Sequence, residues 1–179
     1  MAEISIRVEG SGDRDAIFAV HRAAFPGLEE AELVDEIRSR GWASLSLVAE
    51  VGGEVVGHLL LSPARIIHNS GHLEGLGLAP LSVAPLHQRA GVGSALMEAG
   101  LRACRDQGTP FVVLLGDPGY YQKFGFLPAS DLSLRDEFGG GAAFQVLPLS
   151  AEKLPAEGGV VRYCQAFDRW LPEGSKQDS

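Results

Sequence analysis

The sequence of 179 residues predicts a single domain with an α+β (mixed α/β) fold. Segments with the two-residue periodicity of strands are interleaved with segments of helical periodicity. The chain is long enough to bury a hydrophobic core without a disulfide or a structural metal. A composition of 45% hydrophobic and 21% charged residues is typical of a globular protein and not of a disordered chain.

Seven strands are predicted from alternating or continuously apolar runs that turn residues bound. The first, EISIRV, alternates strictly. The second and third are joined at Gly52-Gly53, a strong hairpin signal. The predicted strands span residues 3–8, 45–51, 55–67, 73–83, 111–115, 143–149 and 159–167.

Four helices complete the predicted order βααβββαβαββ. They span about residues 13–25, 29–40, 87–108 and 117–124. In the last one, Asp117 is a predicted N-cap, Pro118 takes the first helical position, and Gly125 ends the helix. Residues 1–171 are therefore expected to form the domain, and residues 172–179, PEGSKQDS, a loose C-terminal tail.

The net charge and the lengths of the apolar runs argue against nucleic-acid binding, membrane insertion and secretion. A formal net charge of −8 argues against a general nucleic-acid binder, which would carry a basic stripe. No apolar run approaches the roughly 20 residues of a membrane helix, and Glu3 and Arg7 stand where a signal peptide would be apolar. Because Cys104 and Cys164 form neither a disulfide framework nor a CxxC site, we expect a cytoplasmic protein.

The glycine-rich segment LSVAPLHQRAGVGSAL, residues 81–96, is the most informative part of the chain. A strand ends there and a helix follows directly, and the first turn of a helix offers unpaired N–H groups and a positive dipole end to an anion. Gly91 and Gly93 lack side chains that would keep a phosphate away, and Arg89 adds a positive charge. A local diphosphate site is compatible with the acidic chain.

Two common phosphate-binding motifs are absent from this segment, and their absence limits which phosphate ligands it could bind. A P-loop needs Gly-Lys-Ser/Thr, which does not occur, and a dinucleotide fingerprint needs a third glycine where Leu96 stands. The glycines alone leave two interpretations open, a phosphate site and a tight strand-to-helix turn.

The segment resembles the acyl-CoA pyrophosphate loop of the GNAT superfamily of N-acyltransferases, written Q/R-x-x-G-x-G/A. The matching residues are Val83, Pro85, Gln88, Arg89, Gly91, Gly93 and Leu96. The later GDPGYYQKFGF, FQVLPL and VVRYCQAF look like the bacterial YhbS-like branch. The resemblance runs from the first strand to about Phe167. It implies a GNAT-like fold: a central, splayed mixed sheet of about seven strands with helices on both faces.

The resemblance also implies a ligand, acetyl-CoA by default, and no metal. The N–H groups of residues 90–94 would hold the diphosphate, the strand end at 81–83 would pair with pantetheine, and the Val83 N–H would polarise the thioester carbonyl. The implied cofactor-binding residues are Leu81, Ser82, Val83, Gln88, Arg89, Ala90, Gly91, Val92, Gly93, Ser94 and Gly116.

Tyr121, four residues before Gly125, corresponds to the general acid of that superfamily, with the adjacent Tyr120 as the competing candidate. The implied reaction is direct attack of a primary amine, on a small molecule or a protein, within a ternary complex. A base would help, because a lysine-like amine of pKa about 10.4 is almost entirely protonated at pH 7. Glu74, His72 and His87 are candidates for that role, and none of them is assigned to it.

Two other functions stay open on the sequence. The domain would also suit a non-catalytic acyl-CoA sensor, and, more weakly, a dinucleotide-dependent oxidoreductase. His68 and His72 are four apart but flank a turn without a third ligand, so no metal site is expected. We expect a monomer or a homodimer.

Overall fold

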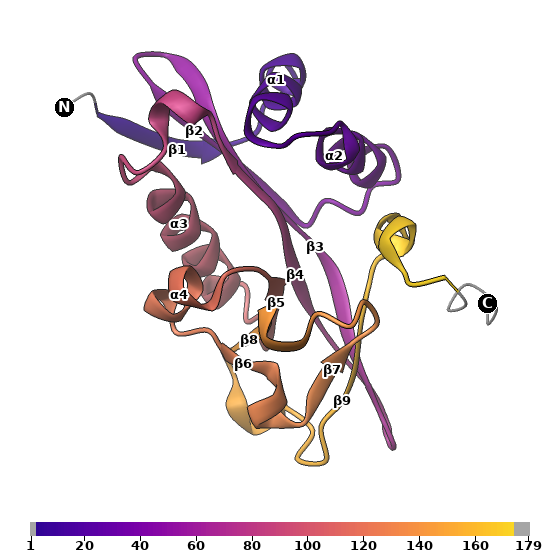
Figure 1. Ribbon diagram of the computed structural model, residues 1–179. Coiled ribbons are helices and arrows are strands. Elements are labelled where there is room, and N and C mark those ends of the chain that lie inside the picture. The colour runs from indigo at the N-terminus through magenta and orange to yellow at the C-terminus, as the bar shows by residue number, and fades with distance from the viewer. Residues whose placement is uncertain (1–2, 174–179) are drawn as a thin grey trace. The chain divides into compact units, whose positions relative to one another are not determined.

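The structure, a computed structural model, describes residues 3–173 (Figure 1). The chain divides into two compact units. The first unit comprises Met1–Leu61 and Leu78–Asp106, and the second comprises Ser62–Gly77 and Gln107–Ser179. The long strands β3 (Glu54–His68) and β4 (Gly71–Val83) contribute residues to both units.

In the first unit, β1 (Ile4–Val8) pairs antiparallel with β2 (Leu45–Val51), and β2 pairs antiparallel with β3. The β2–β3 connection turns at Gly52 and Gly53, whose φ angles of 61° and 84° are left-handed. A two-residue hairpin turn requires such angles, so the predicted hairpin is confirmed. Within this unit, the other neighbour of β3 is β4.

Helices cover both faces of the first unit's strands. Successive side chains of a strand point to opposite faces. A Cβ added at Gly57 of β3 would lie 2.9 Å from Val92 Cγ1 in α3 (Val92–Asp106), whereas the next residue, His58, contacts His21 in α1 (Arg14–Ala24). Helices α1 and α2 (Glu29–Ser39) lie side by side (Figure 1). The expected helices on both faces are therefore confirmed here.

In the second unit, five shorter strands join the sheet formed by the parts of β3 and β4 within Ser62–Gly77. These are β5 (Phe111–Leu115), β6 (Leu127–Pro128), β7 (Leu134–Asp136), β8 (Phe144–Pro148) and β9 (Gly159–Tyr163). β5 pairs parallel with β4 and antiparallel with β8, which also pairs with β6. β9 pairs antiparallel with β3 and parallel with β7. The pairing is mixed, as expected, around a core that includes Ile66, Phe111, Val113 and Phe144.

The structure corrects the predicted number of strands and two predicted element boundaries. The structure adds β6 and β7 to the seven predicted strands, and both are too short to show a periodicity. The last strand ends at Tyr163 instead of residue 167, since Gln165–Trp170 form a 3-10 helix. Helix α3 begins at Val92 instead of residue 87, because Pro85–His87 form a separate 3-10 turn and the chain then takes positive φ angles before α3.

Two other expectations concern the chain as a whole. No helix among residues 3–173 has the length and apolar character needed to cross a membrane. Of the expected tail, 172–179, only residues 172 and 173 are described, so the expectation for 174–179 lies outside the described residues.

Candidate functional site

The predicted anion site lies in the first unit, between the end of β4 and the start of α3. Within this loop Arg89 and Gly91 take φ angles of 60° and 89°. The Gly91 carbonyl accepts the first helical hydrogen bond, from Ala95 N at 2.9 Å, so Gly91 immediately precedes the first turn. These left-handed angles turn the chain sharply from the strand into the helix.

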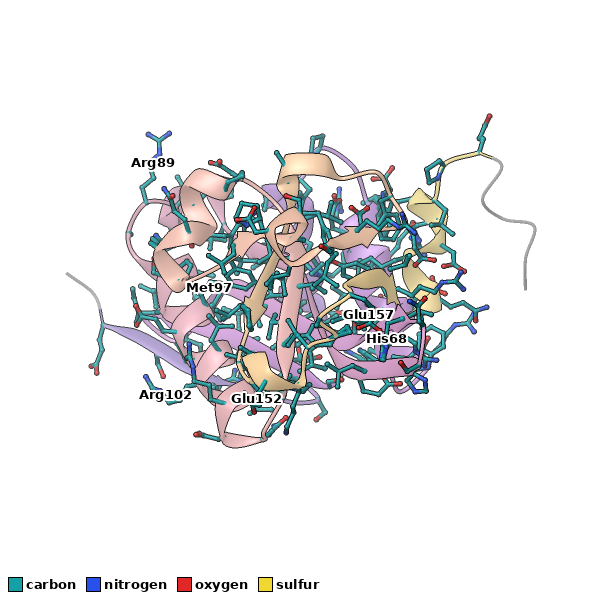
Figure 2. All side chains as sticks on the ribbon, turned by 90° about the horizontal axis from the view of Figure 1, so that it is seen from below. His68, Arg89, Met97, Arg102, Glu152 and Glu157 are labelled. Atoms are coloured by element: carbon teal, nitrogen blue, oxygen red, sulfur yellow. The ribbon has the colours of Figure 1, made fainter. Side chains whose placement is uncertain are left out.

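The loop is open to an approaching anion. N–H groups in the first turn of a helix have no acceptor inside the helix, and the helix dipole adds positive potential there. A Cβ added at Gly91 would meet nothing closer than Ile4 Cδ1 at 3.9 Å. The side chains of residues 88–90 are exposed, and Figure 2 shows Arg89 extending away from the ribbon. The geometry suits a solvated phosphate group.

The end of β4 directs polar groups to its edge away from β3. Ala84 N donates to Val56 O of β3 at 2.8 Å. Because main-chain groups of successive strand residues point to opposite edges, the N–H and C=O of Val83 point the other way. The Gln88 side-chain amide donates to Val83 O at 3.0 Å. Gln88 thus links the loop to the end of β4. The Val83 N–H points to the same edge of β4, the one away from β3.

The two remaining predicted site residues, Gly116 and Tyr121, lie together in the second unit. Asp117 Oδ1 accepts a hydrogen bond from Gly119 N at 2.9 Å and caps α4 (Pro118–Tyr121), as predicted. A 3-10 turn follows, and Gly125 ends it with a φ of 92°. A Cβ added at Gly116 would overlap the Tyr121 ring. Glycine at 116 therefore lets the tyrosine pack against the main chain at the end of β5.

Tyr120 and Tyr121 have different surroundings. Their rings meet edge to face, with centroids 4.9 Å apart and an interplanar angle of 89°. Tyr121 also packs against the buried Phe126, with centroids 6.0 Å apart. The Lys123 ammonium lies 4.2 Å from the Tyr120 ring centroid. Tyr120 therefore contacts a cation, whereas Tyr121 contacts a buried apolar ring.

Burial raises the pKa of the Tyr121 hydroxyl to about 12, with smaller contributions from Tyr120 and Asp117. A buried phenolate is disfavoured because it loses its hydration. The hydroxyl is consequently protonated throughout the neutral range. It is able to donate a proton or a hydrogen bond, and unsuited to act as a base.

A buried polar cluster in the first unit was missed by the sequence analysis. His21 and His58 are both fully buried, and His21 Nε2 lies 2.8 Å from His58 Nδ1. Burial lowers the pKa of His21 to about 4, and the positive charge of Arg38 adds to the effect. Burial likewise lowers the pKa of His58, with contributions from His21 and Arg38. Both imidazoles are neutral at pH 7.

The cluster continues on both sides of the histidine pair. Ser46 Oγ lies 2.8 Å from His58 Nε2 and donates to the Glu9 carboxylate. On the other side, the buried Ser82 places its Oγ 3.4 Å from His21 Nε2. In the sequence, His21 is one member of an apolar helical row, and its partner lies 37 positions away. No local spacing marks such a pair.

The other histidines and acidic candidates lie at the surface. Glu74 pairs with Arg65 at 3.6 Å and with His72 at 3.2 Å. His68 pairs with Glu157 at 3.2 Å (Figure 2). Among residues 3–173 there is no group of three or more His, Cys, Asp or Glu side chains placed to hold a metal ion.

Comparison with known proteins gives a consistent result. The profile described as "Acetyltransferase (GNAT) domain" matches residues 5–129. YhbS of Escherichia coli strain K12, named an uncharacterized N-acetyltransferase, is 36% identical over 167 residues, which cover 92% of this chain and 99% of that protein.

Two solved structures share the fold over nearly the whole chain. One is E. coli YhbS in complex with CoA, with a TM-score of 0.88, 35% identity, and coverage of 95% of this chain and 94% of that one. The other is a GNAT acetyltransferase of Brucella melitensis in complex with acetyl-CoA, with a TM-score of 0.78, 36% identity, and coverage of 94% and 100%. On this evidence the chain belongs to the GNAT family of acetyltransferases.

Proposed function

We propose that this protein transfers the acetyl group of acetyl-CoA to a primary amine, carried by a small molecule or a protein, by direct attack in a ternary complex. The relatives from E. coli and B. melitensis are known as complexes with CoA and acetyl-CoA. The acceptor is the free amine, and the products are an acetamide and CoA.

The loop before α3 is the observation that carries this proposal. Left-handed angles at Arg89 and Gly91 turn the chain from β4 into α3, and a Cβ added at Gly91 would meet nothing closer than 3.9 Å. We infer that the main-chain N–H groups of residues 90–94 bind the CoA diphosphate, with Arg89 as a nearby cation. Each hydrogen bond to a charged group contributes roughly 1.5–3 kcal/mol, so a few of them give useful affinity without a basic surface.

The end of β4 supplies the next part of the mechanism. The Val83 N–H is directed to the edge away from β3, as the Ala84–Val56 bond requires. We assign the pantetheine arm to this edge, at residues 81–83, and the Val83 N–H as donor to the thioester oxygen. As the amine attacks the carbonyl carbon, negative charge develops on that oxygen, and a fixed donor stabilises it.

Tyr121 is assigned as the general acid. When the carbon–sulfur bond breaks, its electron pair stays on sulfur, and the Tyr121 hydroxyl donates a hydrogen bond to that sulfur. The CoA thiol forms with the proton that the attacking nitrogen loses as it becomes an amide, so Tyr121 ends the reaction protonated. The pKa of about 12 keeps the hydroxyl proton in place before reaction. Full transfer to a thiolate whose acid has a pKa of roughly 8.5 is uphill by about 5 kcal/mol, at about 1.4 kcal/mol per pKa unit. The tyrosine therefore acts through a strengthening hydrogen bond to sulfur as the bond breaks.

Two measurements test the proposal. Titration calorimetry should detect binding of CoA, and absence of binding contradicts the assignment of the loop. Release of CoA thiol from acetyl-CoA, followed against a panel of primary amines and lysine-containing peptides, should identify an acceptor. CoA binding without thiol release on any amine would instead favour an acyl-CoA sensor.

A further inference from the structure

The side chain of Gln88 points to a different partner from the one its place in the sequence implies. The family resemblance implies that Gln88 binds the cofactor together with the diphosphate loop. In the structure its Nε2 instead donates to Val83 O of β4, at 3.0 Å. The side chain makes no other hydrogen bond among residues 3–173. Gln88 is therefore directed at the strand and not at the loop.

A short turn brings Gln88 back to the strand that it follows. Pro85–His87 form a 3-10 turn, and His87 N donates to Ala84 O at 2.8 Å. The side chain at position 88 consequently returns beside Val83, five positions earlier in the chain. Gln88 is exposed, so a ligand can displace its side chain without opening the core.

The oxygen that Gln88 uses lies on the edge proposed for pantetheine. Ala84 N donates to Val56 O, so the N–H and C=O of Val83 both point away from β3. An extended chain of amides that lies along such an edge forms hydrogen bonds with its main-chain groups, and the pantetheine arm of CoA contains secondary amides. The Gln88 side chain also ends in an amide. It therefore offers Val83 O the same kind of N–H donor that pantetheine would offer.

We propose that Gln88 couples the pantetheine edge to the diphosphate loop and thereby selects CoA over nucleotides that lack pantetheine. This inference rests on the proposed function. Without CoA, the Gln88 amide holds Val83 O. When CoA binds, a pantetheine amide N–H takes this oxygen. The released Gln88 amide then donates to the diphosphate bound by residues 90–94, which follow it closely in the chain.

The exchange of hydrogen bonds favours CoA. The neutral bond between Gln88 and Val83 is lost, and two bonds replace it, one of them to a charged phosphate. A hydrogen bond to a charged group is stronger than a neutral one. A nucleotide that ends at the diphosphate offers no donor to Val83 O, so moving Gln88 would leave that carbonyl without its donor. Such a nucleotide binds with Gln88 still on the strand.

The test compares three ligands and one substitution. The ligands are CoA, its nucleotide half (3′-phosphoadenosine 5′-diphosphate) and pantetheine, which carries no phosphate. Gln88→Met keeps a side chain of similar length and removes the amide. Gln107→Met, at an exposed glutamine directly after α3, is the matched control and should leave all three affinities unchanged.

The coupling predicts a different response for each ligand. In Gln88→Met the Kd of CoA should rise about three- to fivefold, because the bond to the diphosphate is lost. The Kd of the nucleotide should stay within about twofold, since that ligand never uses Gln88. The Kd of pantetheine should fall about threefold, because Val83 O no longer has an internal donor. Calorimetry measures the first two values, and NMR titration of the full chain measures the weaker binding of pantetheine.

Two other patterns overturn the coupling. Equal losses of affinity for CoA and for the nucleotide would mean that Gln88 binds the diphosphate of either ligand. Unchanged affinities for all three ligands would mean that Gln88 only supports the turn. A crystal structure of the CoA complex gives a direct check, in which Gln88 Nε2 should lie next to a diphosphate oxygen. Gln88 Nε2 still bound to Val83 O in that complex overturns the exchange.

The outcomes also distinguish the two proposals. If wild type binds CoA and Gln88→Met weakens CoA and the nucleotide equally, the coupling is wrong and the acetyltransferase assignment stands. If wild type binds no CoA, the assignment of the loop is wrong, and the coupling that rests on it falls too.

Discussion

In the first unit, the proposed diphosphate site consists of main-chain groups at a loop where Arg89 and Gly91 are left-handed. In the second unit, the proposed acid is a single side chain, Tyr121, packed over Gly116 and against Phe126. The first site, as proposed, depends on backbone angles and should tolerate changes of exposed side chains. The second depends on one oxygen atom and on the apolar surroundings that hold its proton. Binding and chemistry should therefore respond to different mutations.

The largest expected effect separates chemistry from binding. Tyr121→Phe removes the hydroxyl and leaves the ring, so kcat should fall about 10²–10³-fold, while the Kd of CoA stays within about twofold. Steady-state thiol release and calorimetry measure the two quantities. Tyr120→Phe is the matched control, and a larger loss of kcat in that variant would move the acid to Tyr120.

The next effect concerns the stability of the first unit in acid. The folded pKa of His21, about 4, lies below its unfolded value of about 6.5, so the unfolded state binds more protons between these values. Stability is present above pH 6.5 and is lost as the pH falls toward 4, by about 3 kcal/mol for His21 alone. Urea unfolding from pH 7 to pH 4 measures the loss.

Two variants sharpen this measurement. His21→Gln with His58→Gln should flatten the acid limb, whereas His68→Gln, at a hydrogen bond with Glu157 in the second unit, should preserve it. Asp13 titrates elsewhere, because the Arg7 guanidinium lowers the pKa of its carboxyl to about 2. A stability that stays constant from pH 6.5 to pH 4 contradicts the buried, neutral histidines.

A smaller effect tests the backbone of the loop. At a φ of 89°, Gly91→Leu forces a side chain into a left-handed conformation that costs roughly 1–2 kcal/mol, and a relaxed loop loses its aligned N–H groups. The Kd of CoA should rise at least about tenfold. Gly53→Leu, at a φ of 84° in the β2–β3 turn of the same unit, introduces similar strain away from the loop. Equal CoA affinity in both variants would refute the role of the Gly91 backbone.

The smallest effect tests the claim that side chains matter less at this site. Arg89→Gln removes an exposed charge and leaves a shorter polar side chain, and exposed charge pairs contribute about 0.2–1 kcal/mol. The Kd of CoA should rise only about two- to fivefold at low salt, and the difference should shrink in high salt. A loss as large as that of Gly91→Leu would mean that the guanidinium dominates binding.

Much of the fold could be predicted because its signals are local. Gly52-Gly53 specifies a hairpin turn, and Asp117, Pro118 and Gly125 specify the start and the end of a short helix, all as observed. The strands β6 and β7, of two and three residues, carry no periodicity, so only their partners define them. Helix α3 starts late because Arg89, an ordinary residue by type, takes a glycine-like φ that no propensity predicts.

The candidate site also has a part with local sequence signals and a part without them. Residues 88–94 are contiguous, so their spacing could be compared with a known acyl-CoA loop and predicts an anion site there. The cluster of Glu9, His21, Ser46 and His58 comes from four separate segments, and the sequence shows His21 and His58 only as polar interruptions of apolar runs. A pair of histidines that meet across 37 positions becomes visible only when α1 is packed on β3.

The sharing of β3 and β4 between the units has a consequence for protein engineering. The chain passes from one unit to the other after Leu61, again after Gly77, and again after Asp106. A truncation at any one of these places leaves a fragment with at least one incomplete sheet. Expression of the halves as separate domains should therefore fail, and the gene is best treated as indivisible when fusions or split reporters are designed.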